Sequence, residues 1–298
     1  MIYFLITVTV VILLSLIPIS IMLVGPRMLL MPDKRRPEYY FDKYGYSHPS
    51  HIGLKHESGE IVTDEGYKLS YWSVASPNCG KTKGAIVYLH GITDSKVSGL
   101  NYAKALAPYC QRIYLMDMRR HGESGGEYCT YGYFEKHDVV RLIDTIVSEN
   151  PGKPVTLIGS SMGAAIAIQV AAIDKRVSKV IAVAPFYDLF SIALDHQFRH
   201  IGIRNSFLLR SVMHRAEKIA RFDASDVSPA KDIENIHIPI LLVRGEGDKT
   251  VKKQYPQSLS ELAKDAELLT IPGAGHVDVL EKGGADYIER LAKFIDPS

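Results

Sequence analysis

Cysteine is scarce in this chain. The three cysteines are Cys79, Cys110 and Cys129. An odd, sparse count is not a disulfide framework, and no two of them form a C-x-x-C pair that would indicate a metal site. A single disulfide is compatible with the count, so the redox compartment stays open. We expect the three side chains to pack as small hydrophobic residues.

An excess of charge of either sign is also missing. The formal net charge is +2, and the only basic run, Lys34-Arg35-Arg36, is too short to indicate binding of nucleic acid. The apolar content of 46% is ordinary for a folded protein and excludes disorder as the main state. A length of 298 residues favours one α/β domain with an N-terminal appendage over two equal domains.

Charged residues are absent altogether from Ile2 through Val24. At about 1.5 Å per residue, a helix of this run is about 34 Å long, which exceeds a bilayer core of about 30 Å. Residues 1–25 are therefore predicted to be a single-pass transmembrane anchor, which Pro18 would kink but not prevent. A cleaved signal peptide is the alternative. It would require Lys or Arg before the run and small residues at a cleavage site, and neither is clear here.

Basic residues follow the predicted anchor, while only the terminal amine precedes it. The positive-inside bias then places the rest of the chain on the cytoplasmic side, although large domains can cross a membrane regardless of flanking charge. Residues 26–58 are predicted to be a linker lying over the domain surface, because they contain four prolines and several aromatic residues. The basic residues are Arg27, Lys34, Arg35 and Arg36, and the prolines are Pro26, Pro32, Pro37 and Pro49.

From residue 59 to residue 298, short β-branched runs alternate with longer helical patterns. This alternation predicts an α/β fold with a mostly parallel sheet flanked by helices. Eight strands are predicted, over Glu60–Thr63, Lys68–Val74, Ala85–Leu89, Arg112–Met116, Val155–Ile158, Lys179–Val183, Ile240–Val243 and Glu267–Ile271. Helices are predicted around Gly99–Leu106, Phe134–Ser148, Met162–Ala172 and Ala285–Phe294.

A long insertion separates the strand ending at Val183 from the one starting at Ile240. More than fifty residues are too many for a connection without structure of its own. Phe190–Leu194 and Phe207–Ala220 have helical patterns. We interpret about 187–232 as a small helical lid over a functional site.

The segment Gly159-Ser160-Ser161-Met162-Gly163 matches the pattern G-x-S-x-G. In this pattern the central serine sits on a sharp turn from a strand to a helix, and the glycines let neighbouring chain approach without a Cβ clash. The context agrees, because a predicted strand precedes Ser161 and a helix of small residues follows it. A glycine-rich helix cap is the alternative. We favour Ser161 as the nucleophile of an acyl transfer.

A serine at a helix N-terminus also places backbone donors for an oxyanion. The N–H of Met162 points to where negative charge develops on the tetrahedral intermediate. A second donor should come from the loop after Ala85–Leu89, which begins His90-Gly91-Ile92. The N–H of Ile92 is the candidate. We expect His90 to orient this loop rather than to act as a base.

A serine hydroxyl needs a base to remove its proton, and the chain has eleven histidines. The order of such triads on α/β folds is serine, acid, histidine. Only His276 follows the last predicted strand, in the turn Gly273-Ala274-Gly275-His276. The other histidines after Ser161 lie in the lid or directly before a strand, and they are His196, His200, His214 and His237.

The acid should follow an intermediate strand. Ile240–Val243 runs into Arg244-Gly245-Glu246-Gly247-Asp248, where the glycines leave Asp248 free to face a histidine. Asp248 would fix the imidazole tautomer and stabilise the imidazolium without taking its proton. Glu246 and Asp188 are the alternative acids.

These residues together resemble the α/β-hydrolase superfamily, over about residues 58–296. The segment from Asp117 to Ser124 adds to the resemblance, because it is similar to the D-x-R-G-x-G-x-S loop of that superfamily, with Arg120 where glycine is usual. The residues from Ser228 to Asp248 resemble the monoglyceride-lipase and serine-aminopeptidase-like branch, which has membrane-tethered members. The resemblance implies neither a metal nor an organic cofactor.

The expected function is hydrolysis of a small-molecule carboxylic ester or thioester, lipid-like or with an acyl group, through an acyl-enzyme. The anchor would hold the site near lipid, and the lid mixes apolar residues with arginines, as do helices that lie on anionic bilayers. An ordinary cap helix with a solvated charged face is the alternative for the lid. An amidase or aminopeptidase on the same triad, an acyltransferase, and a catalytically silent binding protein are the alternative functions.

Overall fold

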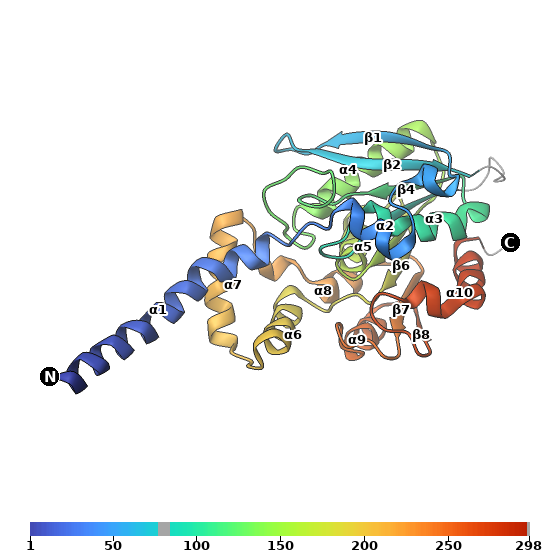
Figure 1. The fold of residues 1–298 in the computed structure, drawn as a ribbon. Coiled ribbons are helices and arrows are strands. Elements are labelled where there is room, and N and C mark those ends of the chain that lie inside the picture. The colour runs from blue at the N-terminus through green and yellow to red at the C-terminus, as the bar shows by residue number, and fades with distance from the viewer. Residues whose placement is uncertain (77–83, 297–298) are drawn as a thin grey trace.

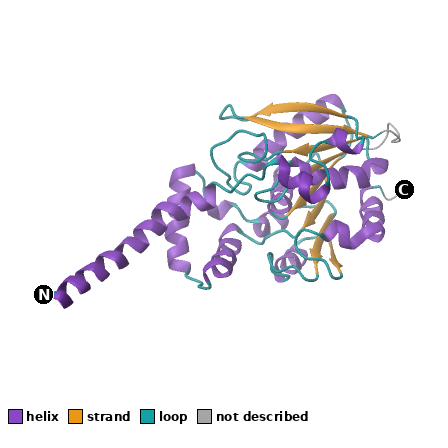
Figure 2. Cartoon of the chain, in the orientation of Figure 1, coloured by secondary structure: helices purple, strands orange, loops and turns teal. Residues whose placement is uncertain are grey.

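An eight-stranded sheet in the order β1-β2-β4-β3-β5-β6-β7-β8 carries the fold (Figures 1 and 2). The computed structural model describes residues 1–76 and 84–296, without the side chains of residue 5 and residues 8–19. The predicted α/β fold and its eight strands are confirmed. The strands are β1 His56–Val62, β2 Lys68–Ala75, β3 Ala85–Leu89, β4 Arg112–Met116, β5 Val155–Ser160, β6 Val177–Val183, β7 Ile240–Gly245 and β8 Ala266–Ile271.

Only β2 runs against the other strands of the sheet. β1 pairs with β2 and β2 pairs with β4 in antiparallel register, whereas β4, β3, β5, β6, β7 and β8 are parallel to one another. The inner parallel strands are continuous apolar runs such as Ala85–Leu89, because helices cover both faces. The carboxyl ends of these strands meet at one edge, where the predicted site residues follow β3, β5, β7 and β8.

Helices pack on both faces of the sheet and enclose two apolar cores. One core lies under α4, α5, α8 and α9, and the other under α3 and α10 (Figure 1). Cys110 and Cys129 are buried in these cores, as expected, and Cys79 lies outside the described residues. The helices are α3 Leu100–Leu106, α4 Glu135–Glu149, α5 Met162–Ile173, α8 Pro229–Ile233, α9 Gln254–Leu262 and α10 Val279–Ile295.

A helical cap follows β6, in the region where the lid is predicted. It consists mainly of α6 Leu189–Ile201 and α7 Ser206–Ala220. Asp188 caps α6 by accepting a hydrogen bond from the N–H of Ser191, and Asn205 caps α7 through the N–H of Leu208. Asp195 on α6 accepts a hydrogen bond from Tyr255 on α9 and pairs with Lys252, and these contacts tie the cap to the domain.

The N-terminal helix α1, Ile2–Leu30, projects from the domain and packs against α7 near its C-terminal end (Figure 1). The two helices approach closely at Gly25, where an added Cβ atom would lie 3.0 Å from Cγ1 of Val212. The predicted anchor, residues 1–25, includes residue 5 and residues 8–19, whose side chains are outside the described part of the structure. Among the described residues, no helix combines the length and the apolar character needed to cross a membrane.

The segment predicted as a linker has regular structure. α1 continues through Pro26 to Leu30, α2 spans Pro37–Tyr44, and a short 3₁₀ helix spans Pro49–Ile52. Proline occupies the first position of α2, where its fixed φ suits a helix start. Tyr40 is buried, so this segment is packed onto the domain.

Candidate active site

Ser161 stands on a strained turn between β5 and α5. Its φ of 53° lies in the left-handed region, which side chains rarely adopt. The flanking glycines permit this turn. A Cβ at Gly159 would lie 2.1 Å from the carbonyl oxygen of Gly163, and one at Gly163 would lie 2.1 Å from that of Leu89. The chain therefore passes close to the turn on both sides, as the G-x-S-x-G pattern requires.

The structure brings Ser161, His276 and Asp248 together from three strand ends. Oγ of Ser161 lies 3.0 Å from Nε2 of His276, and Nδ1 of His276 lies 2.8 Å from Oδ2 of Asp248. These contacts assign the tautomer: Nδ1–H donates to the carboxylate, which leaves Nε2 free to accept the serine proton. The arrangement is that of a nucleophile, a base and an orienting acid.

The carboxylate of Asp248 is held in its ionised form. Its Oδ1 accepts hydrogen bonds from the N–H groups of Thr250 (2.7 Å) and Val251 (3.0 Å). Burial opposes ionisation, but the hydrogen bond and charge of His276, together with these backbone donors, outweigh it and lower the pKa of Asp248 below its ordinary value. A buried anion beside His276 stabilises the imidazolium that forms when Ser161 is deprotonated.

The alternative acids occupy other positions. Both carboxylate oxygens of Asp188 accept hydrogen bonds from Ser191, as the cap of α6. Glu246 is exposed and accepts a hydrogen bond from the N–H of Gly273. Neither carboxylate meets His276, so Asp248 is the acid that the geometry places in the site.

The two predicted oxyanion donors flank the nucleophile. Met162 is the first residue of α5, so its N–H belongs to the N-terminal donors of that helix that have no partner within it. The loop after β3 runs beside Ser161, since a Cβ at Gly91 would lie 3.5 Å from the Cβ of Ser161. Ile92 follows directly in this loop, which is where a second donor is required.

Two buried histidines hold that loop in place. Nε2 of His90 accepts a hydrogen bond from the N–H of Met118, and its Nδ1 contacts the carbonyl of Gly91 at 2.7 Å. Nε2 of His121 accepts one from the N–H of Thr93, whose φ is 62°. His90 thus orients the loop, as predicted. The role of His121 was missed, and its only sequence signal is its place in the Asp117–Ser124 loop.

The backbone of the Asp117–Ser124 loop shows why glycine is usual at the position of Arg120. Arg120 has a φ of 65°, a conformation that glycine adopts without strain. Asp117 fixes the loop by accepting hydrogen bonds from the N–H of Glu123 and from the backbone and Nζ of buried Lys96. The loop is structural, as the sequence suggests.

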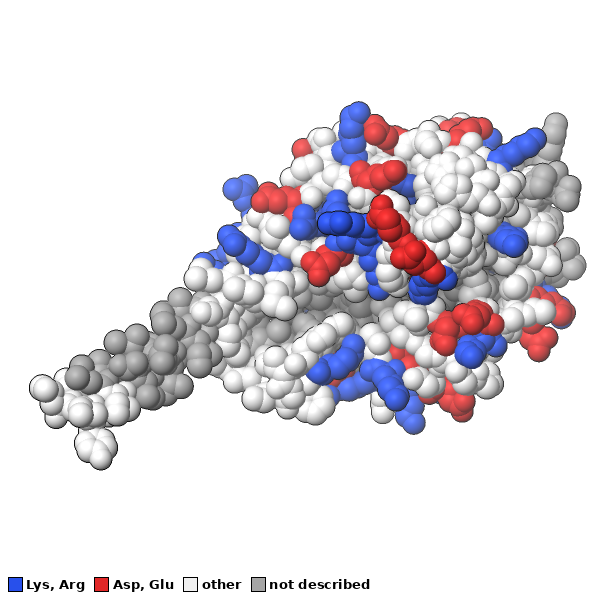
Figure 3. Space-filling view, in the orientation of Figure 1, with Lys and Arg blue, Asp and Glu red and all other residues white. Residues whose placement is uncertain are grey.

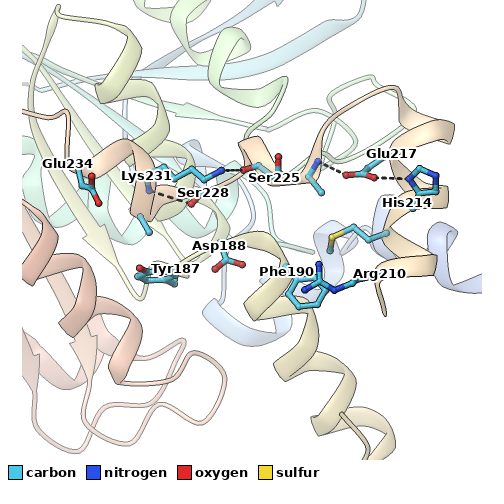
Figure 4. A pocket seen from close by; sticks show the side chains of 13 residues that line it. Tyr187, Asp188, Phe190, Arg210, His214, Glu217, Ser225, Ser228, Lys231 and Glu234 are labelled. Atoms are coloured by element: carbon cyan, nitrogen blue, oxygen red, sulfur yellow. Dashed lines mark hydrogen bonds and ion pairs between the residues drawn. The ribbon is translucent and has the colours of Figure 1, made fainter. Parts of the chain in front are cut away.

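Two cavities lie near the cap and the triad. The larger, about 600 Å³, lies between α6, α7 and α8 and has none of the triad residues in its walls (Figure 4). Figure 4 shows Arg210 beside Phe190 and Lys231 near Ser225 in this cavity. The smaller, about 80 Å³, reaches His276. Among the described residues, no cluster of three or more His, Cys, Asp or Glu could hold a metal ion.

Comparisons with known proteins agree with this geometry. The family model of serine aminopeptidase, S33, matches residues 80–225. The protein YqkD of Bacillus subtilis is 26% identical over 241 residues, which cover 79% of this chain and 78% of that protein. Human monoglyceride lipase is 33% identical over 116 residues, which cover 38% of this chain and 37% of the lipase. The structure of an esterase from Pyrococcus furiosus superposes with a TM-score of 0.69 at 23% identity, over 84% of this chain and 95% of the esterase.

Proposed function

We propose that this chain is a serine hydrolase of carboxylic esters or thioesters. The proposal starts from its family: the chain belongs to the α/β-hydrolase superfamily and is related to the serine-aminopeptidase and monoglyceride-lipase branch. The observation that carries the proposal is the single imidazole of His276, which bridges Ser161 and Asp248. The names of the relatives, an esterase and a monoglyceride lipase, favour an acyl ester as substrate.

The reaction follows from the positions of the three side chains. Oγ of Ser161 attacks the acyl carbonyl while Nε2 of His276 takes its proton, and Asp248 stabilises the imidazolium. The N–H groups of Met162 and Ile92 receive the oxyanion, and one such donor contributes about 3 kcal/mol to transition-state stabilisation. His276 then protonates the leaving alcohol or thiol. Water, activated by the same imidazole, hydrolyses the acyl-enzyme and regenerates Ser161.

A second candidate is an aminopeptidase or amidase on the same triad, because the matching family model bears that description. The chemical step differs only in the leaving group, which is then an amine. Activity on matched octanoyl esters, thioesters and amides separates the candidates. We expect the ester and thioester to be cleaved faster than the amide.

The test of the mechanism is labelling of the full chain in detergent with a tagged fluorophosphonate, which reacts with activated serines. We expect labelling to disappear in Ser161→Ala, which removes the oxygen that bonds to the probe, and the rate of labelling to fall about a thousandfold in His276→Ala, which removes the base. Asp188→Asn is the matched control and should label normally. A folded wild type that does not label would favour a catalytically silent binding protein.

We also propose that residues 1–25 attach the enzyme to a membrane, with the domain on the cytoplasmic side. The uncharged run from Ile2 to Val24 and the projection of α1 from the domain support this attachment (Figure 1). Figure 3 shows no charged side chain among the described atoms of the part of α1 that stands away from the domain, whereas Lys and Arg are interspersed with Asp and Glu over the domain. The cap adds exposed apolar side chains, Phe207 (82% exposed) and Ile203, beside Arg204. These features favour lipid-like substrates.

A further inference from the structure

The proposed reaction requires a place for the leaving group. His276 must give its proton from Nε2 to the leaving oxygen or sulfur, so the leaving group lies against this ring as it departs. The 80 Å³ cavity touches His276, and Ser160, which precedes the nucleophile, also lines it. No residue of the cap contributes to its walls. The cavity is therefore positioned to receive the leaving group.

The volume of this cavity limits what can enter. A protein cavity that accepts benzene has a volume of about 150 Å³, nearly twice the 80 Å³ measured here. An aromatic ring or an acyl chain is too large. A single phosphate or carboxylate group is smaller than a benzene ring and is the size that fits, so the cavity holds the anionic group of a leaving alcohol or thiol rather than the whole of it.

The two walls of the cavity differ in character. The wall formed by the histidine loop and the start of α10 is apolar, with Val277, Val279 and Leu280. A second part of the lining comes from the N-terminal segment around α2, which contributes Arg35, Lys43 and Tyr44, and residues of β3 and α3 complete it. This segment precedes the α/β domain in the sequence, yet it closes a cavity that reaches the triad.

The N-terminal wall is positively charged. The guanidinium of Arg35 lies 4.4 Å from the centre of the Tyr39 ring, and Nζ of Lys43 lies 5.8 Å from the same ring and 4.8 Å from that of Tyr44. Such contacts hold cations over aromatic faces and leave their outer N–H groups available. Two cations therefore line the cavity.

One carboxylate, Asp94, lines the cavity among the described residues, and it is already engaged. Its Oδ1 accepts hydrogen bonds from the hydroxyl of Tyr40 (2.8 Å) and the N–H of Ser95 (2.9 Å), and lies 4.0 Å from Arg35. Asp94 thus neutralises at most one of the two cations. The wall keeps a net positive charge beside His276.

Resting on the function proposed above, we propose that this cavity is a leaving-group subsite in which Arg35 and Lys43 select alcohols or thiols that carry an anionic group. The acyl part of the substrate lies elsewhere. The anion would be held by charge-assisted hydrogen bonds, which are stronger than neutral ones. The N-terminal segment is then a specificity element of the enzyme as well as a connection to α1.

The experiment compares two substrates with the same acyl chain, octanoyl glycerol and octanoyl glycerol phosphate, on the full chain in detergent. We expect the wild type to prefer the phosphate ester in kcat/KM. The double variant Arg35→Gln, Lys43→Gln should lower that preference about tenfold per lost charge-assisted contact. Glycerol phosphate should inhibit the wild type more strongly than glycerol does, which tests the subsite without any variant.

Arg36→Gln is the matched control, because Arg36 is an exposed cation on the same segment that does not line the cavity. It should keep the wild-type preference. Equal rates on the two substrates in a wild type that labels with fluorophosphonate would overturn the subsite and leave the hydrolase standing. A wild type that fails to label would instead reject the proposed function. Equal loss of preference in Arg36→Gln would show a general effect of surface charge and overturn the assignment.

Discussion

His121 shows how much of the site rests on residues that never touch the substrate. Both of its ring nitrogens are occupied, since Nε2 accepts from the N–H of Thr93 and Nδ1 lies 3.0 Å from the carbonyl of Arg119. The ring is fully buried and packs at 5.0 Å against that of His90. Only a neutral imidazole can accept from Thr93, so protonation of His121 would release the loop that carries Ile92.

This arrangement predicts acid sensitivity. Burial, and next the neighbouring His90, lower the pKa of His121 to about 3. Since the unfolded chain titrates near its ordinary value of about 6.5, the unfolded state binds more protons between these values, and the free energy of unfolding falls as the pH drops below about 6.5. The limiting slope is about 1.4 kcal/mol per pH unit for one group.

Urea denaturation of the wild type and His121→Asn at a series of pH values from about 7 down to 5 measures this effect. We expect the wild type to lose stability more steeply than the variant, because the variant lacks the titrating group. His51→Asn, at an exposed position, should keep the wild-type slope. Parallel pH profiles for the wild type and His121→Asn would show that another group is responsible.

At the scale of elements, the strands were predictable and several helices were not. Buried strands such as Ala85–Leu89 and Arg112–Met116 match their predicted bounds, because a continuous apolar run between turns has few other solutions. Helices α9 and α2 were missed. On α9 only Pro256 and Leu259 are buried, and α2 buries only Tyr40, so neither gives a strong apolar periodicity.

The turn between β5 and α5 that carries Ser161, here called the elbow, gives the prediction at this scale. A Cβ at Gly163 would meet the backbone carbonyl of Leu89 at 2.1 Å, and a backbone atom cannot rotate away as a side chain can. Gly163→Ala should therefore push α5 away from β3. We expect about 1–3 kcal/mol loss in the free energy of unfolding, as for other overpacked sites, together with loss of fluorophosphonate labelling.

Measuring stability and labelling separately tests the reason for this effect. Gly125→Ala is a milder comparison, because its Cβ would stand 3.2 Å from the nearest backbone oxygen, that of Lys68. It should retain most of the labelling. A Gly163→Ala variant with wild-type stability and labelling would mean that the close approach at the elbow is not required.

At the scale of the whole molecule, the sequence predicted the parts but not how they meet. The triad was predictable because serine, acid and histidine each follow a strand, in an order set by the fold. The contribution of Arg35 and Lys43 to the cavity that reaches His276 was not predictable. The sequence of a proline-containing segment does not reveal which surface of the domain the segment covers. The burial of Tyr40, its hydrogen bond to Asp94 and the ion pair of Arg35 with Asp94 bring that segment to the site.

The proposed membrane attachment is a property of the whole chain and is tested in cells. Extraction of isolated membranes with alkaline carbonate should leave the wild type in the pellet. Val10→Arg combined with Leu14→Arg should release it, since an arginine at the centre of an inserted helix costs about 2.5–3.5 kcal/mol on the insertion scale. Phe41→Arg, an exposed apolar position on α2, should stay in the pellet. Release of the wild type by carbonate would reject the anchor, whereas protection of the domain from protease added on the cytoplasmic side would keep the anchor and reverse its orientation.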